Sequence, residues 1–103
     1  MIKPSYQEKT IEGNIYYFSM SKTSSVAHVV KRICDLSSLS KKHFGNVILD
    51  LTDAKDADTA LLNRATKALV SSGRIVVTVG KTVKGLDVYP NLGEAVDAVK
   101  AAS

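Results

Sequence analysis

Hydrophobic positions in the first third of the chain follow two different periods. Between Ser5 and Met20, two β-prone runs flank a Glu-Gly-Asn sequence at positions 12–14, where Gly and Asn tolerate the positive φ angles of a tight turn. This pattern predicts an N-terminal β-hairpin. Hydrophobic residues then recur at i, i+3, i+4, i+7 and i+8, which predicts an amphipathic helix with Ser24 or Ser25 as its N-cap. Its apolar stripe comprises Val26, Val29, Val30, Ile33 and Cys34.

In the remaining two thirds, short apolar runs alternate with helical stripes. Residues 47–51 and 75–79 are nearly all apolar, as expected for strands covered on both faces, and residues 86–89 predict a brief further strand. A second helix is predicted to end near Gly73, with Asp56 or Asp58 as its N-cap. Asn91 and Glu94 form a capping-box pattern at the start of a last helix. The stripes of these two helices comprise Leu61, Leu62, Ala65, Ala68 and Leu69, then Leu92, Val96 and Val99.

The order of these elements predicts the fold class. Helices that follow apolar strands indicate an α/β sandwich, here an N-terminal β-hairpin followed by a mainly parallel sheet with about three helices. With 103 residues, 45% of them hydrophobic, we expect one domain over residues 1–103.

Composition narrows the class of function. The net charge of +4 comes from scattered lysines and arginines, which is typical of a solvated surface and disfavours nucleic acid as a partner. No apolar run approaches the roughly 20 residues of a membrane span. One cysteine, Cys34, and a start without an apolar signal core predict a cytoplasmic protein. Neither His28 nor His43 has metal-ligand spacing, so we expect no metal, no cofactor and no enzymatic activity.

Two segments carry a resemblance to a known family. Residues 47–53, with the sequence VILDLTD, precede Asp58-Thr59. This segment is similar to the "vvlDLs…vDSsG" signature of the STAS domain, with eight residues from Asp50 to Asp58. Residues 88–96 resemble the closing strand and "sleeAl" helix of the same family. The chain therefore resembles the STAS domains of bacterial anti-sigma-factor antagonists and of sulfate-transporter tails.

The resemblance implies a site. In the family, the residue after the second Asp is a Ser or Thr that a partner kinase phosphorylates, so Thr59 becomes the phosphorylation candidate. The partner-binding surface is then expected on the loop from Asp53 to Thr59 and on a helix over residues 60–69. Its residues are Asp53, Asp56, Asp58, Thr59 and Asn63.

The chain departs from the family in two places. Ala60, Leu61 and Leu62 stand where the family has a small residue and then Gly. Between Val79 and Leu86 the family places a further helix, but this chain has six residues. Because a parallel crossover normally needs a dozen or more residues, the last strand is either displaced or antiparallel, or the chain is a STAS-like variant with a trimmed edge.

Two functions follow. The first is a regulatory protein-binding module that resembles an anti-sigma-factor antagonist, switched at Thr59, whose partner is an anti-sigma factor or a switch kinase. The alternative is a non-phosphorylated accessory or scaffold subunit of a transporter or of a signalling assembly. Neither requires membrane insertion, and both leave a homo-oligomer open.

Overall fold

The computed structural model describes residues 6–12, 14–21, 26–40 and 42–102, with the side chains of 56–59 excepted. Its centre is a five-stranded sheet in which the strands lie in sequence order. The strands are β1 (Tyr6–Ile11), β2 (Ile15–Met20), β3 (Val47–Asp50), β4 (Val76–Val79) and β5 (Asp87–Tyr89). The helices are α1 (Val26–Ser37), α2 (Asp56–Ser71) and α3 (Leu92–Ala102).

The predicted hairpin and the mainly parallel sheet are both confirmed. Strands β1 and β2 pair antiparallel, from Tyr6 opposite Met20 to Ile11 opposite Ile15. Glu12 has a positive φ of 45° in the turn, whereas Gly13 lies outside the described residues. From β2 onwards, each strand is parallel to the next.

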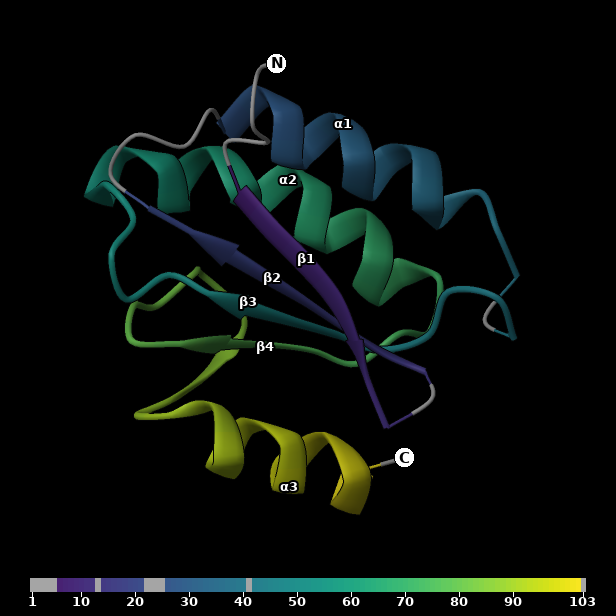
Figure 1. Ribbon diagram of the computed structural model, residues 1–103. Coiled ribbons are helices and arrows are strands. Elements are labelled where there is room, and N and C mark those ends of the chain that lie inside the picture. Colours follow the sequence, from purple (N-terminus) through teal and green to yellow (C-terminus); the bar gives the residue numbers. More distant parts are fainter. Residues whose placement is uncertain (1–5, 13, 22–25, 41, 103) are drawn as a thin grey trace.

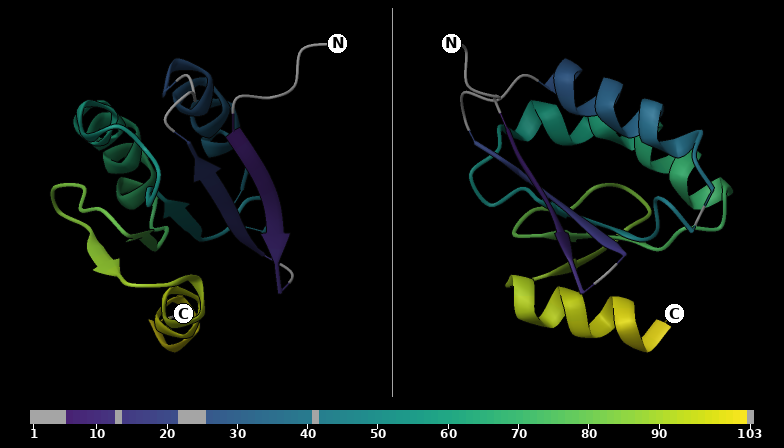
Figure 2. Two further views of the ribbon diagram at one scale, coloured as in Figure 1. Left: turned by 60° about the vertical axis from the view of Figure 1, so that its left-hand side comes forward. Right: turned by 45° about the vertical axis from the view of Figure 1, so that its right-hand side comes forward.

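Helices cover both faces of the sheet (Figures 1 and 2). Helices α1 and α2 lie together on one face, and α3 lies on the other. This arrangement explains why β3 and β4 are almost continuously apolar: Val47, Leu49 and Val76 belong to the cluster under α1 and α2, and Ile48 and Val77 to the cluster under α3.

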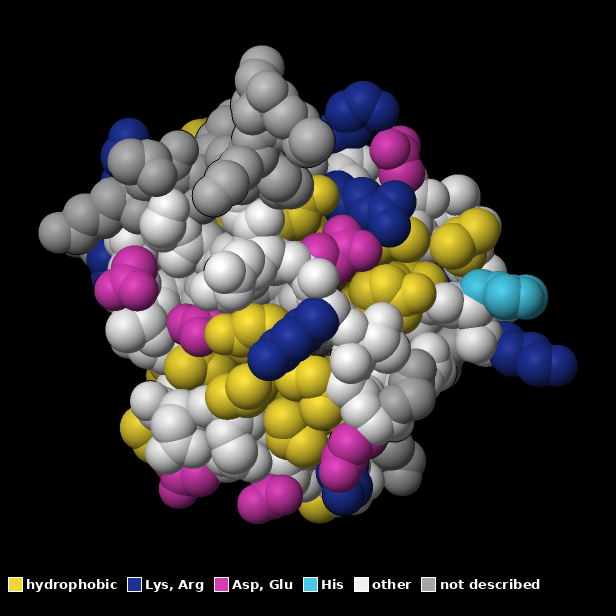
Figure 3. Space-filling view, viewed as in Figure 1, with side chains coloured by type: hydrophobic (Ala, Val, Ile, Leu, Met, Phe, Trp, Pro, Cys, Tyr) yellow, Lys and Arg dark blue, Asp and Glu magenta, His cyan; other side chains and the backbone are white. Residues whose placement is uncertain are grey.

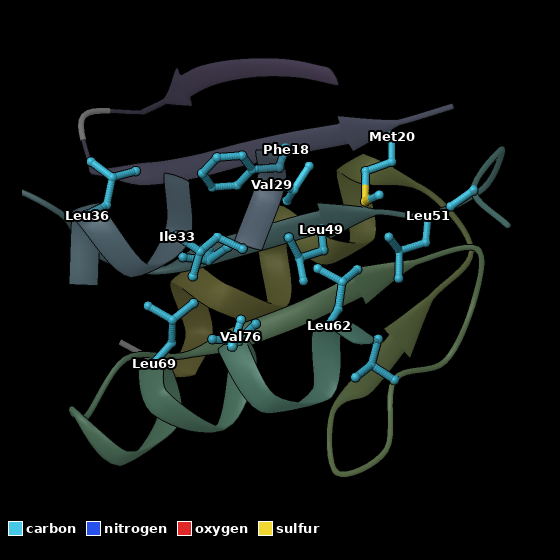
Figure 4. Packing of buried hydrophobic residues seen from close by; sticks show 14 of the residues in the cluster. Phe18, Met20, Val29, Ile33, Leu36, Leu49, Leu51, Leu62, Leu69 and Val76 are labelled. Carbon is cyan, nitrogen blue, oxygen red and sulfur yellow. The ribbon is translucent and has the colours of Figure 1, made fainter. Parts of the chain in front are cut away.

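The larger core cluster lies between the sheet and the α1–α2 layer (Figure 4). Phe18 and Leu49 reach it from the strands, Ile33 from α1, and Leu62 and Leu69 from α2. Each of these side chains is at most 1% exposed. Their continuous packing fixes α2 against the end of β3, where the candidate site lies.

The apolar stripe of α1 differs from its prediction at one position. Val29 and Ile33 are buried, but Cys34 is exposed and Leu36 is buried instead. The buried stripe therefore continues from Ile33 to Leu36, three residues on, rather than to the adjacent Cys34. The predicted caps Ser24 and Ser25 lie outside the described residues.

The last strand is neither displaced nor antiparallel. Val77, Thr78 and Val79 pair in parallel with Asp87, Val88 and Tyr89. Residues 80–86 suffice for this crossover because strands of three or four residues are only about 10–13 Å long, and seven extended residues can span about 23 Å. Val83, 1% exposed, inserts from this connection into the core under α1 and α2. Of the alternatives that the sequence left open, the structure thus favours the trimmed edge.

The surface carries mixed charge. On the face of Figure 3, basic and acidic side chains are interspersed, and hydrophobic side chains gather between β1 and α3. The Lys9 Nζ atom lies 5.1 Å from the centroid of the Tyr17 ring, so its aliphatic stem shields part of that aromatic surface. In the part of the chain that the structure describes, no helix is long and apolar enough to cross a membrane.

Candidate functional site

The candidate site begins at the carboxyl end of β3, where Asp50 is the one polar residue of an apolar strand. Its Oδ1 atom accepts hydrogen bonds from the backbone N–H of Thr52 at 3.1 Å and from the Thr52 hydroxyl at 2.8 Å. Its Oδ2 atom accepts a hydrogen bond from the Tyr17 hydroxyl at 2.5 Å. An aspartate that bonds to the backbone two residues on folds the chain into an Asx turn, so Asp50 directs the chain from β3 towards α2.

The Tyr17–Asp50 contact also affects protonation. Burial raises the pKa of the Tyr17 hydroxyl above its ordinary value of 10.0, and donation to the Asp50 carboxylate raises it further. The two effects have different physical causes: a phenolate here would be poorly solvated, and it would face the negative charge of Asp50. Tyr17 therefore serves at neutral pH as a fixed hydrogen-bond donor.

The turn after β3 packs against the connection between β4 and β5. The Lys81 Nζ atom donates a hydrogen bond to the carbonyl oxygen of Ala54, and Ala54 is itself buried. At Gly80, φ is +85°, and a Cβ atom there would lie 2.5 Å from the Thr52 Oγ1 atom and 2.8 Å from the Thr52 Cα atom. The two chain segments thus touch at backbone distance, which holds the turn before α2 in one conformation.

Helix α2 starts earlier than its hydrophobic stripe indicates. The predicted loop from Asp53 to Thr59 is wrong for its second half, because the helix begins at Asp56. The predicted caps Asp56 and Asp58 are also wrong: the N-cap residue is Lys55, which makes no side-chain cap hydrogen bond. A lysine ammonium has no acceptor atom for the free N–H groups of the first turn. Asp56 and Asp58 instead occupy the first turn, where negative charge is favourable to the helix dipole.

The predicted site residues spread along the start of α2. Asp53 is exposed in the turn before the helix, and Thr59 is the fourth helical residue, so both belong to the same corner. The side chains of Asp56, Asp58 and Thr59 lie outside the described residues. Asn63 lies seven residues into the helix, about 10 Å along its axis from Asp56.

Sequence reasoning placed Leu61 in the buried stripe, and the structure corrects this. Leu61 is 59% exposed, whereas the neighbouring Leu62 is fully buried. Position 61 precedes the true core positions Leu62, Ala65 and Leu69, which follow the 3- and 4-residue spacing without it. An exposed leucine close to Thr59 adds apolar contact area to the predicted partner surface.

Two basic residues of α2 were missed. Arg64 and Lys67, with Ala60 and Asn63, line a polar hollow of about 300 Å³ on the flank of the helix. The Asn63 Oδ1 atom in this hollow is buried, and no hydrogen-bond partner for it is found among the described residues. The sequence did contain a signal, since positions 60, 63, 64 and 67 share one face of a helix.

A buried arginine, Arg74, has a structural role. Its side chain donates to the carbonyl oxygens of Phe44 and Leu39 and to the Ser72 hydroxyl. Its guanidinium carbon lies 5.0 Å from the centroid of the Phe44 ring. These contacts satisfy the buried cation and join the end of α2 to the segment before β3. Among the residues described here, no group of three His, Cys, Asp or Glu side chains is placed to hold a metal ion.

Comparison with known proteins gives one informative result. No protein-family model and no curated protein matches the chain. Among solved structures, the chain is similar to the anti-sigma factor antagonist SpoIIAA in its unphosphorylated form, with a TM-score of 0.67. The match covers 92% of this chain and 97% of that chain at 13% sequence identity. At this identity the likeness concerns the fold: the chain has the SpoIIAA-like α/β fold that the STAS resemblance of its sequence predicted.

Proposed function

We propose that this chain is a cytoplasmic regulatory module that binds another protein, in the manner of an anti-sigma-factor antagonist, and is switched by phosphorylation at Thr59. The observation that carries the proposal is the likeness to SpoIIAA over 92% of the chain. The partner is an anti-sigma factor or a switch kinase, and the chain itself is not an enzyme.

The proposed partner surface consists of Asp53, Asp56, Asp58, Thr59 and Asn63, together with the exposed Leu61. Three features support it. The Asp50 turn and the Lys81 contact hold the segment before α2, so binding would cost little ordering entropy. Leu61 supplies an exposed apolar anchor, and the sequence of the first turn of α2 includes the polar residues Asp56, Asp58 and Thr59.

The proposed switch is a phosphoryl transfer. The Thr59 hydroxyl oxygen attacks the γ-phosphorus of ATP held by the partner kinase, the bond to ADP breaks, and the hydroxyl proton passes to a base of the kinase. The product gains a charge of about −1.5 to −2 next to Asp56 and Asp58. The added charge repels an acidic partner, and an apolar partner would have to desolvate the phosphate, so phosphorylation releases the partner.

The test uses the full chain as bait in extracts of its native cell, with bound proteins identified by mass spectrometry. We expect wild type and Thr59→Ala to capture the same partner, Thr59→Glu to lose most of it, and circular dichroism to be unchanged. Thr10→Glu is the matched control, because Thr10 is exposed on β1, away from α2. If Thr59→Glu captured the partner as well as Thr10→Glu does, the switch would have to be abandoned.

One observation favours a second function. Leu61 and Leu62 stand where the STAS family has Gly, and Leu62 is fully buried, so this helix start is firmly packed. The alternative is a scaffold or accessory subunit that uses the same surface without phosphorylation. Recovery of a membrane transporter, with Thr59 unmodified in the recovered complex, would select it. Recovery of a GHKL-type kinase that phosphorylates wild type but not Thr59→Ala would select the switch.

A further inference from the structure

One flank of α2 is left without a neighbouring helix. On the face that carries α1 and α2, the next connection along the sheet, residues 80–86, contains no helix. Figure 2 shows this connection beside α2 in its left-hand view, with no helix beyond it. A hollow of about 170 Å³ lies between them, lined by Thr66, Lys67, Val70, Ser71, Lys84, Gly85 and Leu86.

This hollow is part of a longer groove. It shares Lys67 with the polar hollow lined by Ala60, Asn63 and Arg64. Positions 63, 64, 67, 70 and 71 lie three, four, seven, ten and eleven residues after position 60, so the six positions form one stripe along the helix. Twelve residues of helix rise about 17 Å, which is enough to receive about three turns of a docked helix.

Hydrophobic side chains lie exposed in the groove and on the neighbouring strand. Val70, which lines the groove, is 49% exposed, and Val88 of β5 is 43% exposed. Val88 pairs with Thr78, and side chains alternate along a strand, so Val88 is on the same face as Val76, under the α1–α2 layer. The helical layer therefore stops before it reaches β5.

Basic side chains border the same groove. Arg64, Lys67 and Lys84 are exposed, and none of them takes part in the ion pairs found between described side chains. Nor does α2 offer Arg64 or Lys67 an acidic residue three or four positions away. Among the residues whose side chains are described, the lining of the groove contains no acidic one. Positive charge around an apolar strip is complementary to an amphipathic helix with acidic flanks.

We infer that this groove, named here the α2 groove, docks an acidic amphipathic helix supplied by the partner protein. That helix lies where the trimmed crossover leaves no helix of the chain's own. Its apolar residues contact Val70 and Leu86, and its carboxylates pair with Arg64, Lys67 and Lys84. The inference rests on the proposed function in one respect, that the chain works by binding a protein.

The test titrates the ¹⁵N-labelled full chain with two synthetic peptides of about 14 residues, four helical turns. The acidic peptide has Leu at i, i+3, i+4 and i+7 spacing and Glu on its flanks, and the basic peptide has Lys in place of each Glu. We expect the acidic peptide alone to shift the amide signals of Thr66, Val70, Gly85 and Leu86. Equal binding of the basic peptide, or shifts confined to other surfaces, would overturn the inference.

Three variants sharpen the result. Lys67→Glu and Lys84→Glu should each weaken binding of the acidic peptide about fivefold to tenfold, since a reversed charge repels the peptide. Val70→Gln should weaken it about fivefold by removing an apolar contact without a change of charge. Lys42→Glu is the matched control, because Lys42 is exposed before β3 and its reversal changes net charge equally. If Lys42→Glu lowered the affinity for the acidic peptide as much as Lys67→Glu does, the attraction would be nonspecific and the inference about the groove would be overturned.

Two further outcomes separate the hypotheses. If sedimentation showed a dimer that Val70→Gln dissociates, the occupant would be a second copy of the chain, and the acidic helix would be wrong. If neither peptide bound the chain while Thr59→Glu still released a captured partner, the inference about the α2 groove would be wrong and the proposed function would be supported.

Discussion

The parallel crossovers before and after β4 both connect neighbouring strands of the sheet, but only the first of them contains a helix. Between β3 and β4 the chain forms α2, whose Leu62, Ala65 and Leu69 enter the core. Between β4 and β5, residues 80–86 supply Val83 as the one fully buried side chain of the connection. A helix buries the sheet residues along its whole length, whereas a single inserted side chain buries only the residues next to it.

The absence of a helix from the connection between β4 and β5 changes the surface beside α2. A loop with one buried anchor closes the core at Val83, but it leaves Val88 and the flank of α2 exposed. It also brings Lys84 beside Lys67 at the rim of one hollow. The short connection between β4 and β5 therefore leaves open the groove in which we infer a partner helix.

The largest effects are expected in the core under the longer crossover. Leu62→Ala should lower the free energy of unfolding by about 2 to 5 kcal/mol, because rigid neighbours leave a cavity. Val83→Ala should cost about 1 to 2 kcal/mol, because a loop can settle into the space. Val47→Ala, which removes the same atoms from a fully buried position of β3, is the control and should fall between them. Urea unfolding measures all three, and a larger loss for Val83→Ala than for Val47→Ala would show that the connection is as rigid as the sheet.

The two glycines of the shorter crossover allow a matched comparison. Both have positive φ, +85° at Gly80 and +87° at Gly85, but an added Cβ has open space at Gly85 and meets Thr52 at Gly80. Gly85→Ala should cost about 1 kcal/mol, the strain of a left-handed alanine. Gly80→Ala should cost about 3 kcal/mol, since backbone must also move. Equal thermal and urea stabilities for the two variants would mean that the contact with Thr52 does not constrain the corner.

Elements with a complete local pattern were predicted well. Strands β3 and β4 are recognisable because both of their faces are covered, and α3 begins where expected. At its start the backbone N–H of Glu94 donates to the Asn91 Oδ1 atom at 2.9 Å. The Glu94 carboxylate accepts from the Asn91 side-chain amide at 3.3 Å, rather than from the backbone N–H of the usual capping box.

Features set by distant contacts were predicted less well. Asp56 and Asp58 both suit an N-cap, yet Lys55 holds that position, because the turn before it is fixed by Asp50 and by Lys81 from another loop. Leu61 fits a helical stripe as well as Leu62 does, and only the position of α1 and the sheet decides between them. The α2 groove needs two segments more than a dozen residues apart, so no local pattern could reveal it.

An effect as small as that of Gly85→Ala is predicted at the entrance to the longer crossover, where the Tyr17 hydroxyl donates to Asp50. Tyr17→Phe removes that donor while the two Thr52 bonds to Asp50 remain, so the unfolding free energy near pH 8 should fall by about 1 kcal/mol.

The same contact gives a pH dependence with a definite sign. Because burial and the Asp50 carboxylate raise the pKa of Tyr17 above 10.0 in the folded chain, the folded state holds this proton more tightly than the unfolded state. The stability that Tyr17 contributes is therefore fully present below about pH 10, its unfolded pKa, and is lost as pH rises through the folded pKa. Tyr6 also has a raised pKa, so the informative quantity is the difference between wild type and Tyr17→Phe. The difference in unfolding free energy between the two proteins, measured with urea, should shrink above pH 10. Tyrosinate absorbance should show that Tyr17→Phe lacks one titration of the wild type, and that this titration has a pKa above the ordinary tyrosine value. A difference that stays constant from pH 8 to pH 11 would mean that the hydroxyl is not tied to Asp50, and that the turn into α2 is held by Thr52 alone.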